Sequence, residues 1–145
     1  LRGVWQTAAG ATVAGGLHTL VLGPFLRLPE PLNPDLLGTL DGLVLKWWVN
    51  GPEASFTYAQ LKESGGFPYW TLMVAGHRMD IPLPDLTAAW GLQPFCPGDG
   101  TVDLLRVYKP DFSIDQHDVR VLDQSLWRSW ARSSLPMSVP NGFAE

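Results

Sequence analysis

Turn-forming residues punctuate this chain at intervals of about 8 to 12 residues, and many of the runs between them alternate apolar and polar side chains. The clearest runs lie at 41–49, 54–61, 68–76 and 101–111. Prolines and glycines, 13 and 15 of the 145 residues, leave little room for long helices. The pattern predicts an all-β fold, an antiparallel β-sandwich or a small barrel of jelly-roll type.

Trp47 and Trp48 are adjacent in the first of these runs. Neighbouring side chains of a strand point to opposite faces, so the two indoles cannot share one core. The charged Lys46 lies on the same face as Trp48 and marks it as the more exposed one. We therefore expect Trp47 inside the domain and Trp48 at a covered face or an interface.

Aromatic side chains are the main candidates for a binding surface. Trp48 would form a row with Tyr58 and with Tyr69 or Trp70 if the strands paired in sequence order. Such a row stacks sugar rings, forms half of a protein interface, or is ordinary core beneath a second sheet or the segment 126–130. The candidates for an interface or for ligand stacking are Trp48, Tyr58, Tyr69, Trp70, Trp127 and Trp130.

The length predicts a single domain with flanking segments. The helical spacing of Leu122, Leu126, Trp127 and Trp130 predicts a short helix near the C-terminal end, with Ser125 as its N-cap. The expected organisation is an apolar Gly/Pro-rich N-terminal segment or arm over 1–40, a β domain with that helix over 41–132, and an extended C-terminal arm over 133–145.

Proline spacing carries the prediction of the arms. The stretches 24–38 and 133–145 both contain several prolines among apolar residues, so neither should form a helix. We expect both to be extended, poor in regular structure, and packed on something other than their own core. Residues 11–22 predict a weak strand broken by Gly15 and Gly16, and residues 84–92 one or two helical turns.

Charge argues against several partners. The ten Lys and Arg residues are scattered singly against fourteen Asp and Glu, which disfavours nucleic-acid binding. The uncharged stretch between Arg2 and Arg27 is long enough to span a bilayer, but its glycines, threonines and Pro24 disfavour a membrane helix. At 17% charged residues the surface is weakly polar, which favours cover by a partner such as another copy of the chain. The chain starts at Leu1 without methionine, so we expect it to be processed or incomplete there.

Chemical motifs are weak throughout. Cys96 is alone and excludes an intrachain disulfide. His77 and Asp80 occur without a nucleophile elbow, a zinc-protease motif or a glycine-rich phosphate loop, so we expect no enzyme.

The best metal-like spacing is Asp115, His117 and Asp118, with Asp99 or Asp103 as additional ligands. Strand-edge and turn polarity accounts for these residues equally well. We therefore expect no metal and no cofactor.

These observations predict a non-enzymatic structural or assembly protein. The expected kind is a virion component, such as a capsid decoration, minor capsid or tail protein, or an extracellular filament subunit, and its location a virion or the extracellular space. Its partners would be copies of itself or a larger assembly such as a capsid, joined through the arms and the aromatic face. The alternative is a β-sandwich carbohydrate-binding module, and a small hydrolase is the third hypothesis.

Overall fold

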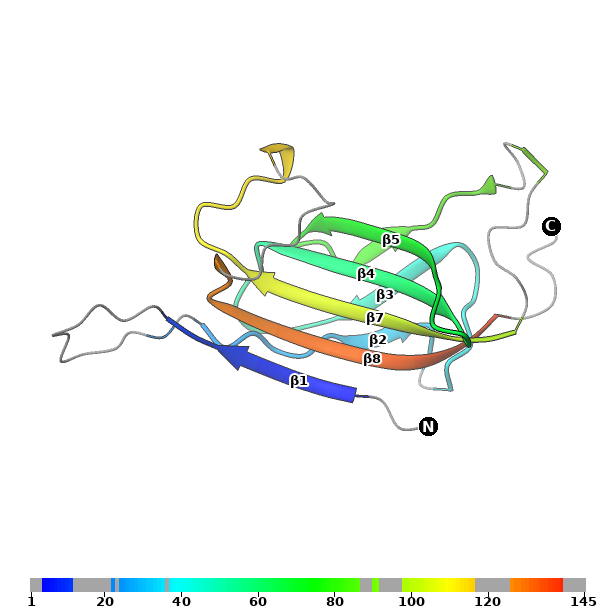
Figure 1. Cartoon of the computed structure of the whole chain (residues 1–145), viewed down its shortest axis with the longest axis horizontal. Coiled ribbons are helices and arrows are strands. Elements are labelled where there is room, and N and C mark those ends of the chain that lie inside the picture. The colour runs from blue at the N-terminus through cyan, green and yellow to red at the C-terminus, as the bar shows by residue number, and fades with distance from the viewer. Residues whose placement is uncertain are drawn as a thin grey trace, which may run out of the picture.

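The computed structural model describes residues 4–11, 22, 24–35, 37–86, 90–91, 98–116 and 126–139. These residues form two antiparallel sheets that pack face to face (Figure 1). The larger sheet has the strand order β1-β8-β7-β4-β5, and the smaller one β2-β3-β6. The strands are β1 (Val4–Ala9), β2 (Glu30–Asn33), β3 (Val44–Trp48), β4 (Phe56–Glu63), β5 (Pro68–Ala75), β6 (Asp80–Pro82), β7 (Gly98–Tyr108) and β8 (Ser129–Val139).

The fold class predicted from the sequence is confirmed at the level of an all-β protein with two packed antiparallel sheets, which do not close into a barrel. Figure 1 shows β2 and β3 lying behind the broad ribbon of the larger sheet. The largest strand pairing joins β7 to β8, with Gly98 opposite Val139 at one end and Tyr108 opposite Ser129 at the other. These two long strands form the middle of the larger sheet together with β4.

The core lies between the sheets. In β3, Leu45 and Trp47 are buried with 1% of each residue exposed, whereas Trp48 is 45% exposed. The predicted alternation of the two tryptophans is therefore confirmed. From the larger sheet, the buried side chains opposite them are Ala59, Leu61, Val102, Leu104, Met137 and Val139.

The predicted C-terminal helix is wrong where the structure describes it, because Ser129–Val139 is β8, which lies between β1 and β7. A 3₁₀ turn, η1 (Ile114–Gln116), follows β7. Ala131, Ser133 and Met137 are buried with a period of two, as in a strand with one face on the core. Because two of these buried residues are an alanine and a serine, the alternation of apolar and polar side chains was not visible in the sequence.

The expected C-terminal arm is likewise corrected for residues 133–139, which belong to this central strand. Pro136 does not interrupt it. Ser138 donates from its backbone N–H to the carbonyl of Gly38, on the edge of β8 that faces away from β7. The nitrogen of Pro136, two residues earlier, lies on the same edge, so the proline removes no hydrogen bond from the β7–β8 ladder.

The segment 24–38 contains the short strand β2 and is otherwise irregular, as predicted for its described residues. It packs on this domain's own core, however, which corrects the second half of that prediction. Leu26 is 2% exposed and forms a small cluster with Ala54 and Ala131. Ser133 also donates from Oγ to the carbonyl of Pro29 at 3.0 Å. These residues fasten the segment to the inner face of the larger sheet.

Some predicted features lie outside the described residues. The strand over 11–22 is described only at its two ends, and the helical turn over 84–92 only in part. Within the described part of the chain, no helix has the length and apolar character needed to cross a membrane.

Candidate ligand-binding cleft

Three strands of the larger sheet end at one place. Ser129, the first residue of β8, pairs with Tyr108 at the end of β7 and with Ala9 at the end of β1. The backbone just before β8 is fixed on both sides, because Arg128 donates to the carbonyl of Tyr108 at 3.0 Å and accepts from the N–H of Gly10 at 2.7 Å. Loop residues that follow β7 and precede β8 are thereby held next to each other.

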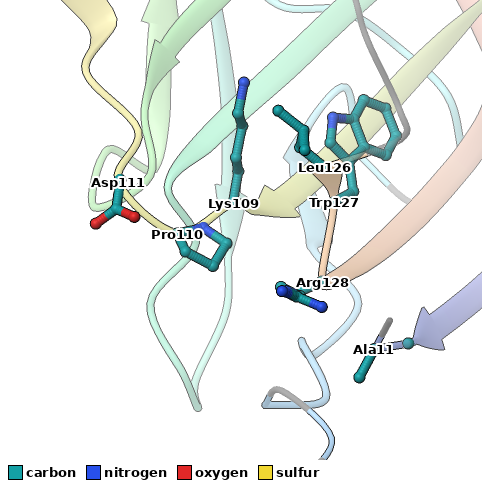
Figure 2. Close-up of a pocket in the computed structure, with 8 residues that line it drawn as sticks. Ala11, Lys109, Pro110, Asp111, Leu126, Trp127 and Arg128 are labelled. Carbon is teal, nitrogen blue, oxygen red and sulfur yellow. The ribbon is translucent and has the colours of Figure 1, made fainter. Parts of the chain in front are cut away.

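These loop residues surround a cavity of about 540 Å³ (Figure 2). A second hollow of about 240 Å³ adjoins it, since both are lined by Gly10, Trp127 and Arg128. We call the two together the tryptophan cleft. The total falls in the size range of small-molecule sites in proteins. Its lining residues are Ala8, Ala9, Gly10, Ala11, Lys109, Pro110, Asp111, Leu126, Trp127, Arg128 and Trp130.

The ring of Trp127 packs against the larger sheet. Its ring meets that of Phe56 edge-on, with centroids 6.4 Å apart and planes at 74°. Phe56 also contacts Phe112 at a centroid distance of 4.7 Å and is fully buried, although its side chain is on the face of the larger sheet that points away from the smaller one. We call this the outer face. Phe112 and Trp127 therefore cover one end of the outer face, and Trp127 remains half-buried beside the cleft.

Trp130 lines the narrower part of the cleft. It occupies the outer face of β8, in register with Ala8 of β1 on one side and Val107 of β7 on the other. The small side chain of Ala8 leaves the indole half-buried and accessible from the β1 side. Two tryptophans three residues apart thus line one continuous surface.

Charged side chains complete the cleft. Lys109 is fixed through its backbone, because its N–H donates to Ser55 Oγ and its carbonyl accepts from that hydroxyl, both at 2.9 Å. Figure 2 shows Lys109 reaching up beside Leu126, and Arg128 below Trp127 just before β8. Asp111 has a positive φ of 58° and is directed to the far side of Pro110. Neither Lys109 nor Arg128 has an ion pair with a described carboxylate.

An ion cluster lies further along the outer face. Asp103 Oδ2 is 2.8 Å from Lys62 Nζ and 3.0 Å from Arg132 Nη2. Burial alone would raise the pKa of Asp103, but hydrogen bonds from Lys62 and Ser134 and the charges of Arg132 and Lys62 together hold that pKa below its ordinary value. Arg132 follows Trp130 on the outer face of β8 and continues the polar surface away from the cleft.

The structure brings only two of the six candidate aromatics together, Trp127 and Trp130. The predicted row is not formed, because β3 and β4 belong to different sheets and Trp48 projects from the smaller sheet alone. Tyr58 is half-buried on the outer face of β4, opposite Leu105. On β5, both Tyr69 and Trp70 pack partly against the core.

Sequence reasoning missed the charged residues of the cleft, Lys109, Asp111 and Arg128. Each is a single charge in a turn, and such charges are most often solvated. The signal that was available is the position of Lys109 and Asp111 directly after an apolar strand and of Arg128 beside Trp127. The sequence alone does not show that these residues are neighbours, because this follows only from the pairing of β7 with β8.

The other chemical candidates stay apart. Asp115 and Asp99 are exposed, Asp103 is engaged with two cations, and His117 and Asp118 lie outside the described residues. No group of three or more metal-ligating residues occurs within the ranges that the structure describes.

The histidine motif gives no catalytic arrangement either. His77 Nδ1 is 3.9 Å from Glu53 Oε1 at an exposed position, and Asp80 pairs with Arg78 at 2.9 Å rather than with the histidine.

Comparison with known proteins adds no assignment: no family model matches the chain, and no curated protein or solved structure is significantly similar to it.

Proposed function

We propose that this chain is a non-catalytic carbohydrate-binding module and that the tryptophan cleft is its binding site. The observation that carries the proposal is the placement of Trp127 and Trp130 along one continuous cleft. Indole faces stack on the apolar faces of sugar rings, and the polar groups around them orient the hydroxyls. Lys109, Asp111 and Arg128 supply such polar groups at the rim.

The cleft is preorganised, which favours binding of a flexible ligand. The edge-on contact with Phe56 fixes the Trp127 ring, and the backbone bonds to Tyr108 and Gly10 fix the main chain of Arg128. Side chains that are already ordered lose less entropy when a ligand binds. Little of the binding free energy is therefore spent on ordering the protein.

The test is electrophoresis in native gels that contain immobile polysaccharides, both neutral and acidic. With seven tryptophans in the chain, fluorescence alone would not identify the site. Two variants address the cleft: Trp130→Ala removes a stacking surface, and Gly10→Leu fills the space, since a Cβ at Gly10 meets no atom within 4 Å. Trp48→Ala is the control, because it removes an exposed tryptophan from the other sheet.

We expect at least one polysaccharide to retard the wild-type protein and the control equally, and both cleft variants to migrate as if the polysaccharide were absent. If Trp130→Ala and Gly10→Leu are still retarded but Trp48→Ala is not, the binding site lies on the smaller sheet and not in the tryptophan cleft. Absence of retardation by every polysaccharide would contradict the proposal.

Assembly, as a virion component or a filament subunit, is the second candidate function. It is favoured by the exposure of Leu32, Trp48 and Met79, which are 59%, 45% and 41% exposed on or beside the smaller sheet. The backbone bond from Trp47 N–H to Met79 O places Met79 next to the end of β3. Sedimentation velocity tests this candidate: an oligomer that dissociates in Trp48→Ala supports it, and a monomer at all concentrations contradicts self-assembly.

A further inference from the structure

The described side chains along the tryptophan cleft and the adjoining outer face carry an excess of positive charge. Lys109, Arg128 and Arg132 are the cations nearest the two tryptophans, and Lys62 lies beyond Arg132. Against these four cations stand three carboxylates: Asp111, Asp103 and, near the start of β7 on the same face, Asp99. The whole chain has the opposite sign, with a formal net charge of −4. The positive charge is therefore a local property of this surface.

The cations of the cleft have free hydrogen-bond donors. Within the described residues, the ammonium of Lys109 and the guanidinium of Arg128 have no carboxylate within 4.0 Å. Among the described residues, Arg132 bonds Asp103 through Nη2 alone, which leaves its other guanidinium nitrogens available. Asp111 is the only charged acceptor among the lining residues. A neutral sugar needs acceptors as well as donors, whereas a carboxylate or sulfate group needs donors only.

We propose that the ligand of the tryptophan cleft is an acidic glycan, in which a sugar carboxylate or a sulfate ester is held by Arg128 and Lys109. A guanidinium binds a carboxylate or sulfate through two parallel hydrogen bonds, and the nearby ammonium adds a second positive charge. The indoles of Trp127 and Trp130 stack on the sugar rings, and Arg132 meets the next acidic unit along β8. This inference rests on the proposed function of the cleft.

A sugar polyanion fits this surface better than a nucleic acid does. Nucleic-acid affinity arises from many phosphates neutralised by a broad basic patch. Here Arg128 and Arg132 alternate with the indoles of Trp127 and Trp130 along the β8 segment, while the chain as a whole is acidic. A ligand with anionic groups one to two sugars apart and apolar ring faces between them matches that order.

The experiment is isothermal titration of the full chain with four probes of similar length. The probes are an oligogalacturonate, a heparin-derived oligosaccharide, neutral cello-oligosaccharide and a single-stranded oligonucleotide. Arg128→Gln and Lys109→Gln each remove one cleft charge. Lys46→Gln is the matched control, because it removes the same charge from an exposed position on the smaller sheet. Circular dichroism checks that every variant is folded.

We expect one of the two acidic glycans to bind more tightly than the neutral one, with affinity that falls as salt is added. Arg128→Gln should weaken that binding by about tenfold or more, Lys109→Gln by a smaller factor, and Lys46→Gln not at all. Preference for the oligogalacturonate assigns the anion as a carboxylate, and preference for the heparin fragment assigns it as a sulfate.

Three results would overturn the inference. If neutral sugar binds as tightly as acidic sugar and Arg128→Gln does not change its affinity, the acidic-glycan inference is wrong. The proposed carbohydrate-binding function would still stand. If Arg128→Gln and Lys46→Gln weaken the binding of the acidic glycan equally, the affinity depends on the net charge of the chain and not on the cleft. Binding of the oligonucleotide alone, or of no probe, removes the carbohydrate function as well.

Discussion

Lys62 Nζ lies 2.8 Å from Asp103 Oδ2, and the two residues join β4 to β7 across the outer face of the larger sheet. Arg132 of β8 donates to the same oxygen at 3.0 Å, so a single carboxylate connects three adjacent strands. Asp103 is only 7% exposed, and these contacts replace the water that its Oδ2 loses on folding. The stability of this sheet should therefore depend on the ionisation of Asp103.

That dependence predicts acid sensitivity. The pKa of Asp103 is lowered in the folded protein, where its hydrogen bonds and the neighbouring charges outweigh burial. A carboxyl with a lowered native pKa stabilises the fold fully above its unfolded-state pKa of about 4, and this contribution is lost as the pH falls through the lower native value. Urea unfolding of the wild type should show the loss below about pH 4.

Asp103→Asn should reduce the free energy of unfolding at neutral pH by about 1 to 3 kcal/mol, because it leaves Lys62 and Arg132 without their anion. It should also flatten the acid limb of the stability curve. Asp99→Asn, at an exposed position of the same strand, is the control and should keep the wild-type curve. An unchanged acid limb in Asp103→Asn would contradict the assignment.

The two adjacent tryptophans should differ sharply in their contribution to stability. Trp47 is 1% exposed in the core, so Trp47→Ala should cost about 3 to 5 kcal/mol in urea unfolding. Trp48 is 45% exposed, and Trp48→Ala should change stability by less than about 1 kcal/mol. If both variants lost the same free energy of unfolding, Trp48 and the exposed face of the smaller sheet would have to be covered in the isolated chain.

The same pair shows what a sequence reveals about such a fold. Strict alternation around Lys46 predicted the orientation of both tryptophans, because period-two patterning is a local property of a half-buried strand. In β8 the buried positions include Ala131 and Ser133, which lack that contrast, while Trp127 and Trp130 fall by coincidence at helical spacing. The strand forms because β1 and β7 pair with it, and such long-range pairing is not visible in a local window.

The candidate cleft was predictable to the same extent. Trp127 and Trp130 could be chosen because tryptophans are frequent at binding surfaces. Their charged neighbour Lys109 is eighteen residues earlier in the chain than Trp127, and only the register of Tyr108 with Ser129 brings the two together. Single charges in separate turns carry no signal until that register is known.

Arg106 gives a prediction about the segment that precedes β2. Its side chain lies on the inner face of β7, 2% exposed, and donates to the carbonyls of Arg27 at 3.1 Å and Pro52 at 3.3 Å. Burial lowers the pKa of Arg106, partly offset by the negative charge of Glu53. The guanidinium thus ties two irregular segments to the larger sheet.

Arg106→Ala should lower the free energy of unfolding by about 2 to 4 kcal/mol, because it removes a buried side chain and two carbonyls lose their charged donor. Arg106→Lys should recover only part of the loss, since one ammonium replaces a planar group that reaches both carbonyls. Hydrogen exchange provides the local readout: amides around Arg27 and Pro52 should lose protection in Arg106→Ala. Unchanged protection there would show that apolar packing alone holds these segments.

Gly76 links the stability of the fold to the geometry of the cleft. A Cβ at Gly76 would lie 1.7 Å from the carbonyl oxygen of Ala54, so Gly76→Ala must displace the backbone at 54 and 55. We expect this to cost about 1 to 3 kcal/mol in urea unfolding. Gly65→Ala, where the added methyl makes no contact shorter than 3.5 Å, is the control and should be nearly neutral.

The displacement should also reach the cleft. Ser55 follows Ala54, and its hydroxyl holds Lys109 through both the N–H and the carbonyl of that residue. A shift at Ser55 therefore moves Lys109 relative to Arg128, whose backbone is fixed separately by Tyr108. Gly76→Ala should weaken binding of an acidic glycan at a temperature where the variant is fully folded, while Gly65→Ala, outside the cleft, leaves affinity within about twofold. Full affinity in a destabilised Gly76→Ala would show that the position of Lys109 does not depend on Ser55.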